Sequence, residues 1–219
     1  MTTFPGSPKV LKGGLVLIDA DTGQVRGIIS LQYNPDSVTR SLQVQAAGAE
    51  AGQRSEPLRF KGPAVETIKL DAEIDATDQL EFPDQNRATV ENGIQPQLAV
   101  LESLANPTSA QLLRVDSDAS SGTLEIAPML APLTLFVWGK SRIVPVRLTD
   151  FSITEEAFDP RLQPIRVKAS IECKVLTSSD LPLQHVGGTL YIAYRQAVEQ
   201  LATMVTSSDV RPLGLEHLP

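Results

Sequence analysis

The sequence predicts an α+β fold built on a predominantly antiparallel β-barrel, with one internal helix and one C-terminal helix; a β-sandwich is the alternative. Three observations favour this fold. Segments near residues 70 and 170 alternate apolar and polar residues with a period of two, and an Asp/Gly turn near the N-terminus separates two apolar segments. Such alternation indicates strands with one buried and one solvated face. Because strand patterns outnumber helical ones, we expect a barrel or sandwich.

The longest predicted element is a hairpin within Leu133–Leu176. The polar residues of its last strand share one face, and the other face is formed by Ile165, Val167, Ala169, Ile171, Cys173 and Val175. The turn at Phe158–Pro164 contains an aspartate and two prolines, which favour turns. The preceding strand changes parity near Thr149-Asp150, which predicts a β-bulge. Strands of this length would extend about 40 Å, which is long for an ordinary domain.

The N-terminal part is predicted to contain an arm, a hairpin and a third strand. Residues 1–13 are rich in proline and glycine and are expected to form an arm that becomes ordered on assembly. Strands at 15–18 and 24–33 flank DADTG, which resembles a calcium loop but lacks the later ligands, so we predict a plain turn. Tyr33-Asn34-Pro35 ends the second strand, since proline has no N–H donor. A strand at 38–45 and a loop at 46–57 follow.

The next strand is predicted at 64–75, where the apolar positions, apart from Glu66, are the even ones. Its odd positions include Asp71, Glu73 and Asp75. Paired carboxylates can perform acid–base catalysis, as in a hydrolase. Residues two apart in a strand share a face, however, and no histidine accompanies these three. We therefore interpret them as one solvated strand face.

Two helices are predicted. The internal one lies within 84–105, with Gly93 as a break, Pro96 in a first turn and an end before Asn106-Pro107. Residues 108–131 are expected to be a long excursion with a small hairpin, and a candidate contact loop. The C-terminal helix is predicted at 189–205, capped by Thr189 or the preceding glycines. The expected organisation is the arm, a barrel domain at 14–178 and a helical extension at 179–219.

Composition and motifs exclude several classes of function. With 19 basic and 26 acidic residues the chain has a net charge of −7 and no basic run, which argues against nucleic-acid binding. We expect no membrane insertion, because no apolar segment is long enough. One cysteine and two distant histidines offer no disulfide or metal motif, and phosphate-binding and nucleophile-elbow motifs are absent. We therefore predict a protein that is not an enzyme and uses no cofactor.

A series of short motifs resembles one known family. In order they are Tyr33-Asn34-Pro35, the string EPLRFKG at 56–62, the strand at 68–75, Phe136-Val137-Trp138-Gly139, and Ala157-Phe158-Asp159-Pro160 followed by a basic-apolar strand. The series is similar to the tube-associated baseplate protein of contractile injection systems, the tube-initiator or hub component of phage-tail-like particles. The resemblance covers about residues 14–176, most of the chain.

This resemblance implies a barrel of the phage-tail-tube type that forms a ring, expected to be a hexamer, between the inner tube and the spike. The implied partners are other copies of the chain, the inner tube protein, the spike or hub protein and other baseplate subunits. The residues expected at subunit interfaces are Tyr33, Asn34, Pro35, Trp138, Phe158, Asp159, Pro160, Arg161, Leu162, Tyr191, Tyr194 and Leu201. Without a secretory signal, assembly is expected in the cytoplasm, and release of the finished particle is left open.

An alternative function follows from the C-terminal part. Many members of that family carry a LysM domain, and residues 185–193, HVGGTLYIA, resemble the opening of a LysM unit. No second strand follows in the sequence, so a LysM domain is expected to be absent or degenerate. A cell-wall glycan-binding module therefore stands as the second hypothesis. The 185–205 helix is otherwise expected to pack on a neighbouring baseplate subunit.

Overall fold

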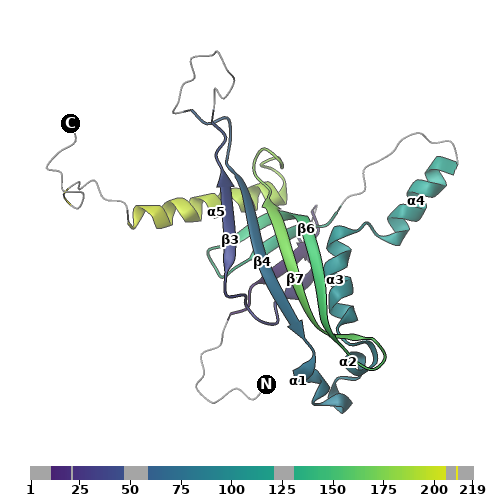
Figure 1. The fold of residues 1–219 in the computed structure, drawn as a ribbon. Helices are drawn as coiled ribbons and strands as arrows, with labels where there is room; N and C mark the ends of the chain where they lie inside the picture. Colours follow the sequence, from purple (N-terminus) through teal and green to yellow (C-terminus); the bar gives the residue numbers. More distant parts are fainter. Residues whose placement is uncertain (1–10, 21, 47–58, 121–130, 206–210, 212–219) are drawn as a thin grey trace.

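The described part of the chain forms one antiparallel sheet flanked by helices (Figure 1). The computed structural model describes residues 11–20, 22–46, 59–120, 131–205 and 211. Within them the sheet has seven strands in the order β2-β1-β5-β6-β7-β4-β3. The strands are β1 (Gly14–Ile18), β2 (Val25–Ser30), β3 (Val38–Gln43), β4 (Val65–Asp75), β5 (Leu133–Val137), β6 (Ile143–Phe158) and β7 (Pro164–Val175).

The helices lie between β4 and β5 and after β7. They are α1 (Thr77–Leu80), a 3₁₀ turn η1 (Pro83–Gln85), α2 (Arg87–Asn92), α3 (Gln95–Ala105), α4 (Ser109–Ser120) and α5 (Val186–Thr203). In Figure 1, α1 and α2 lie at one end of the long strands, whereas α4 and the C-terminal half of α5 extend away from the sheet in different directions. The described chain is thus a central sheet with two projecting helical arms.

The long strands β4, β7 and β6 form the middle of the sheet, and their predicted alternation is confirmed. Ile171 is 2% exposed and lies opposite Leu70 on one side and Phe151 on the other. The predicted bulge is also confirmed, because the β6–β7 register shifts between Leu148 and Asp150. One face of these strands, the dry face, is therefore largely apolar and buried, and the other is polar.

Helices cover the dry face at its two ends. Near the β6–β7 turn, Ile94, the N-cap of α3, and Leu98 of α3 pack with Val167 of β7 in one cluster of buried residues. At the other end, Tyr191 and Tyr194 of α5 join the main cluster, which also contains Leu70 and Val175. The C-terminal helix therefore shares the core of the sheet.

Two features predicted from the sequence are not found in the described residues. Closure of the sheet into a barrel is not observed, because β2 and β3 end the strand order and do not pair in the described residues. Six antiparallel steps separate these two edge strands, so they run in the same direction, and closure would require a parallel pair. The prediction of one internal helix was wrong, since the residues described before β5 form four α-helices.

The small hairpin expected within 108–131 was also wrong over 109–120, where the chain forms α4. Its apolar residues are few, and the Asp/Ser-rich end of the helix resembles a turn in composition. The prediction for 121–130, and most of those for the N-terminal arm and the 46–57 loop, fall outside the described residues. The break at Gly93 and the helix end before Asn106 are confirmed.

Candidate assembly surfaces

The tip of the β6–β7 hairpin is held in shape by Asp159. Its Oδ1 accepts hydrogen bonds from the backbone N–H groups of Arg161 (2.7 Å) and Gln163 (2.8 Å). The hydrogen bond from Gln163, together with those from Arg161, lowers the pKa of Asp159. The backbone N–H groups of Asp159 and Leu162 close the turn by bonding to Gln163 and Asp159 respectively. The turn predicted from the Asp/Pro pattern is therefore self-supporting.

Two apolar side chains of this tip are exposed. Leu162 is 78% exposed and Phe158 is 47% exposed. Leu162 also has φ of 63°, in the left-handed region that a residue with a Cβ adopts at a cost of about 1–2 kcal/mol. A glycine would relieve this cost, yet the position holds a large apolar side chain in solvent. Leu162 thus combines a strained backbone with an exposed apolar side chain.

The base of the tip is bound to the chain's own helices. Arg161 donates a hydrogen bond to the carbonyl of Val90 in α2, and the N–H of Ile94 donates to the carbonyl of Pro164 (2.9 Å). Gly93 lies between them with φ of 59°, and a Cβ there would be 2.2 Å from the Pro164 oxygen. This contact explains why the break between α2 and α3 is a glycine.

The Tyr33-Asn34-Pro35 and Trp138 motifs meet at the start of β1. The side chain of Asn34 accepts a hydrogen bond from Gly13 N–H (2.9 Å) and donates one to the Leu11 carbonyl (2.7 Å). Trp138 stacks on Phe136 at 5.8 Å, and a Cβ on Gly13 would be 2.3 Å from its ring. In this structure Asn34 and Trp138 therefore fix the entry into the sheet. Pro35 is half-buried, and Tyr33 is exposed.

Helix α5 begins with a histidine N-cap and is bound to the sheet by a partly buried polar network. The Nδ1 of His185 accepts a hydrogen bond from Gly187 N–H (3.0 Å), so the predicted cap at Thr189 or the glycines was wrong. Arg40 of β3 donates to Glu66 (2.6 Å) and to the hydroxyl of Tyr194 (2.7 Å). The hydrogen bond to Glu66 raises the pKa of Arg40.

Of the three interface residues predicted in α5, two are enclosed by the chain itself. Tyr191 and Tyr194 are both buried in the main core, and burial raises the pKa of Tyr191. Leu201 is exposed, and the next apolar residues, Met204 and Val205, are 76% and 86% exposed. The most exposed large apolar side chains of α5 and its end are therefore those near its C-terminus.

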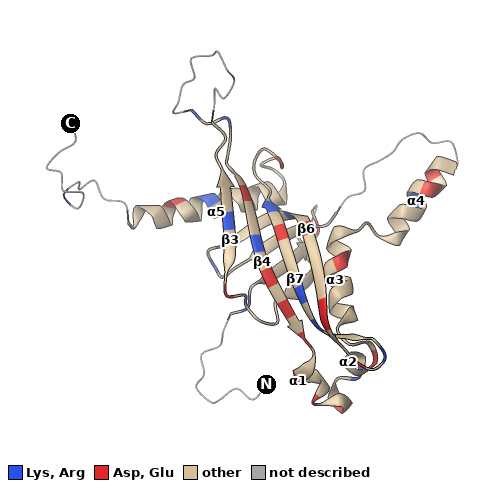
Figure 2. Ribbon diagram, viewed as in Figure 1, with Lys and Arg blue, Asp and Glu red and all other residues tan. Residues whose placement is uncertain are grey.

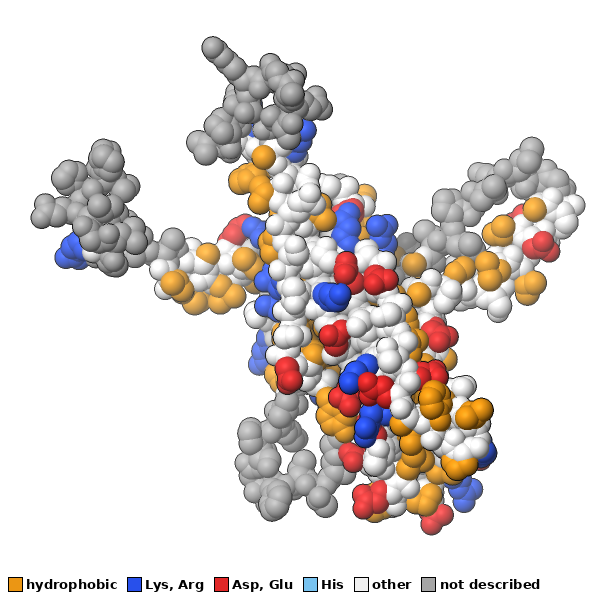
Figure 3. Space-filling view, in the orientation of Figure 1, with side chains coloured by type: hydrophobic (Ala, Val, Ile, Leu, Met, Phe, Trp, Pro, Cys, Tyr) orange, Lys and Arg blue, Asp and Glu red, His pale blue; other side chains and the backbone are white. Residues whose placement is uncertain are grey.

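Helix α4 has no buried residue along its twelve positions. Its apolar side chains include Leu112, which is exposed, and Leu113, which is 68% exposed. Figure 3 shows hydrophobic side chains on both projecting arms, α4 and the end of α5, and on the lower end of the molecule. A twelve-residue helix in isolation is marginally stable in water. The chain thus contains an amphipathic arm without a partner among the described residues.

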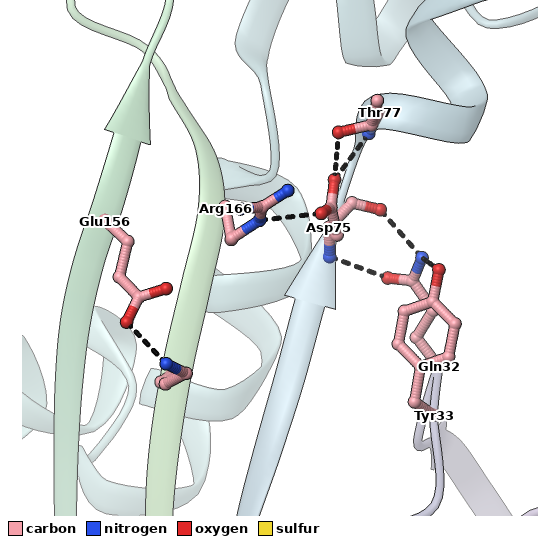
Figure 4. A network of polar contacts seen from close by, with 7 residues as sticks. Gln32, Tyr33, Asp75, Thr77, Glu156 and Arg166 are labelled. Carbon is pink, nitrogen blue, oxygen red and sulfur yellow. Dashed lines mark hydrogen bonds and ion pairs between the residues drawn. The ribbon is translucent and has the colours of Figure 1, made fainter.

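The polar face of the long strands carries ion pairs between neighbouring strands (Figures 2 and 4). Asp75 of β4 accepts a hydrogen bond from Arg166 of β7 (2.7 Å) and two from Thr77. Although burial opposes the shift, the bonds from Thr77 and Arg166 lower the pKa of Asp75. Lys168 pairs with Glu156 of β6 at 2.8 Å. The carboxylates singled out in the sequence are therefore part of a solvated, cross-paired strand face.

The described residues show no arrangement typical of catalysis. Burial raises the pKa of the Cys173 thiol to about 12, so it is a poor nucleophile. In the described part of the chain no group of three or more His, Cys, Asp or Glu residues could hold a metal ion. His185 caps a helix, and His217 lies outside the described residues. None of the described helices has the length and apolar composition needed to cross a bilayer.

Sequence reasoning missed the Arg40–Glu66–Tyr194 network. The signal was present, because Glu66 is the one charged residue on the otherwise apolar face of its strand. A charge at such a position needs a partner. The partner could not be named, since Arg40 lies 26 residues from Glu66, and Tyr194 lies 154 residues from Arg40.

Comparisons with known proteins add no relative. The chain matches no protein-family model, and no curated protein matches it.

Proposed function

We propose that this chain is a non-enzymatic structural subunit of the inner baseplate of a contractile, phage-tail-like injection particle. In this role it joins the inner tube to the spike or hub, and copies of the chain form a ring, a hexamer, in which the sheet takes the barrel form of a tail tube. Assembly takes place in the cytoplasm. The motif series within residues 14–176 motivates this class.

The observation that carries the proposal is the amphipathic arm α4. Its exposed Leu112 and Leu113 have nothing to pack against within the described residues. Full burial of a leucine side chain contributes about 1.5–3 kcal/mol, so a partner covering both would add several kcal/mol before ordering costs. A helix this short gains most of its stability from tertiary packing. An assembly subunit would provide the missing partner.

The hairpin tip gives independent support. A strained, exposed leucine is costly for an isolated chain, and strained residues commonly occur where a protein contacts something else. Leu162 and Phe158 lie together at this tip, at the end of the longest strands in the molecule. They would reach an adjacent subunit or ring, as expected from the excess length of the hairpin.

The glycan-binding alternative has weaker support. Gly187, Gly188 and Tyr191, which fall in the LysM-like string, are buried within the chain. They are therefore not free to contact a polysaccharide. A pull-down on purified peptidoglycan separates the two functions, because the assembly hypothesis predicts no retention that depends on residues 185–205.

The direct test is the oligomeric state and the effect of deletion. The purified chain, or the chain coexpressed with the tube and spike proteins, should give ring-shaped oligomers by electron microscopy. Deleting the gene should leave cells without assembled tubes. Normal particles in the deletion strain would refute the proposal.

A further inference from the structure

A groove opens between the free edge of β2 and the distal half of β4. Its volume is ≈ 1190 Å³, and it reaches the apolar side chains of Ile74, Leu101 and Ile171. One rim is formed by Ile28 and neighbouring residues of β2, and the other by β4 with α1 and the turn after it. We call it the seam groove, because it lies where a closed barrel would have its seam.

The edge of β4 is open along this groove. Strand β3 begins at Val38, opposite Leu70, so it covers only the first half of β4. At the far end, Asp75 is capped by the side-chain amide of Gln32, which accepts from Asp75 N–H (3.0 Å) and donates to its carbonyl (2.7 Å). This pair of bonds, visible in Figure 4, is the pattern that a residue of an added strand would make.

Beyond the last residue of β4 that pairs with β3, Glu73 lines the groove. Backbone groups alternate sides along a strand, so the N–H and C=O of Glu73 point to the same side as those of Asp75. No strand of the described residues pairs with β4 on that side beyond Leu70. The groove therefore offers a free donor and acceptor at the spacing used for strand addition.

The carboxylates around this edge favour an added strand that carries basic side chains. Asp71, Glu73 and Asp75 point to the polar face, where β7 supplies neighbours on one side only. The rim adds Asp78 and Glu81, and the one basic residue among the described lining residues is Lys12. An added strand would place alternate side chains beside these carboxylates and the others over the apolar floor.

We propose that the seam groove binds an extended segment of a partner protein that alternates basic and apolar residues, added as a strand to the free edge of β4. The basic side chains complete the charge pairing of Asp71 and Glu73, and the apolar ones fill the groove. This site uses neither projecting arm nor the hairpin tip, so it is distinct from the proposed assembly surfaces.

The test uses a short labelled peptide of alternating valine and lysine, titrated into the full chain by fluorescence anisotropy. Binding should be saturable, and a valine–glutamate peptide should not bind. The double variant Asp71→Lys/Glu73→Lys should weaken the lysine peptide about tenfold and admit the glutamate peptide, because opposite-charge cross-strand pairs become like-charge pairs. Asp150→Lys, on the polar face of β6, is the matched control and should bind as the wild type does.

A second variant keeps the test valid if the double variant misfolds. Asp78 lies at the rim, outside the sheet, and Asp78→Lys should weaken binding of the lysine peptide by a smaller factor. The amide of Glu73 should become protected from hydrogen exchange when peptide is added. Absence of binding, equal weakening by Asp150→Lys, or an unchanged Glu73 amide would overturn the proposal. So would binding that requires removal of residues 1–10, since the chain would then fill its own groove.

Discussion

The middle of the sheet and the projecting arms differ in how completely the chain satisfies its own side chains. In the middle, Ile171 is only 2% exposed, and on the polar face Asp75 forms an ion pair with Arg166. On the arms, Leu113 and Met204 are both more than two-thirds exposed, and α4 buries nothing. The packing in the middle of the sheet therefore accounts for the stability of the fold. The arms carry the apolar side chains that a partner could cover.

The largest loss of stability should come from a charge placed in the buried core of the sheet. Replacing Ile171 with aspartate places an unpaired charge on the dry face, at a cost comparable to the whole stability of a domain, about 5–15 kcal/mol. We expect loss of cooperative unfolding by circular dichroism. Ser152→Asp, on the exposed face of β6, is the control and should unfold like the wild type. A soluble, cooperative Ile171→Asp protein would mean that the dry face is wrongly assigned.

The second largest loss of stability should come from removing the polar contacts between α5 and the sheet. Arg40→Leu leaves Glu66 buried without its cation, which should cost about 2–4 kcal/mol in urea denaturation. Replacing both residues by leucine should recover most of the loss. The more exposed pair gives the matched control, because Arg166→Leu should cost no more than about 1 kcal/mol. Equal losses for Arg40→Leu and Arg166→Leu would show that burial of the pair is unimportant.

A smaller loss in the free energy of unfolding is expected when the contact between the hairpin and the helices is disturbed. Gly93→Ala combines a left-handed φ with a clash against Pro164, so we expect a loss of about 2–3 kcal/mol. Gly139→Ala separates the two causes, because Gly139 has φ of 74° with nothing within 4 Å of the added Cβ. It should cost about 1 kcal/mol. If the two variants unfold at the same urea concentration, the close approach to Pro164 contributes nothing.

The smallest change distinguishes stability from assembly at a single residue. Leu162→Gly should raise the free energy of unfolding of the isolated chain by about 1 kcal/mol, since the left-handed strain is relieved. The same variant should impair ring formation, because the exposed leucine is lost. Thermal unfolding and electron microscopy of the same sample give the two readouts. A gain in stability with unimpaired rings would remove the tip from the assembly surface.

The same contrast sets the limit of prediction from sequence. Strands, bulge and turn followed from local alternation and turn residues, because each pattern repeats within a few positions. The helix α4 was missed since its Asp/Ser-rich end mimics a turn. The contacts of Gly93 with Pro164, of Asn34 with Gly13 and of Gln32 with Asp75 could not be predicted, because they join residues far apart in the chain.

The exposed arm α4 provides the most direct test of the assembly claim. The double variant Leu112→Lys/Leu113→Lys and the control Ser117→Lys, all at exposed positions of α4, would each replace the wild-type chain in cells that make the particle. We expect the three proteins to be equally stable, and the double variant alone to lack assembled particles by electron microscopy. Normal particle numbers with the double variant would contradict the account.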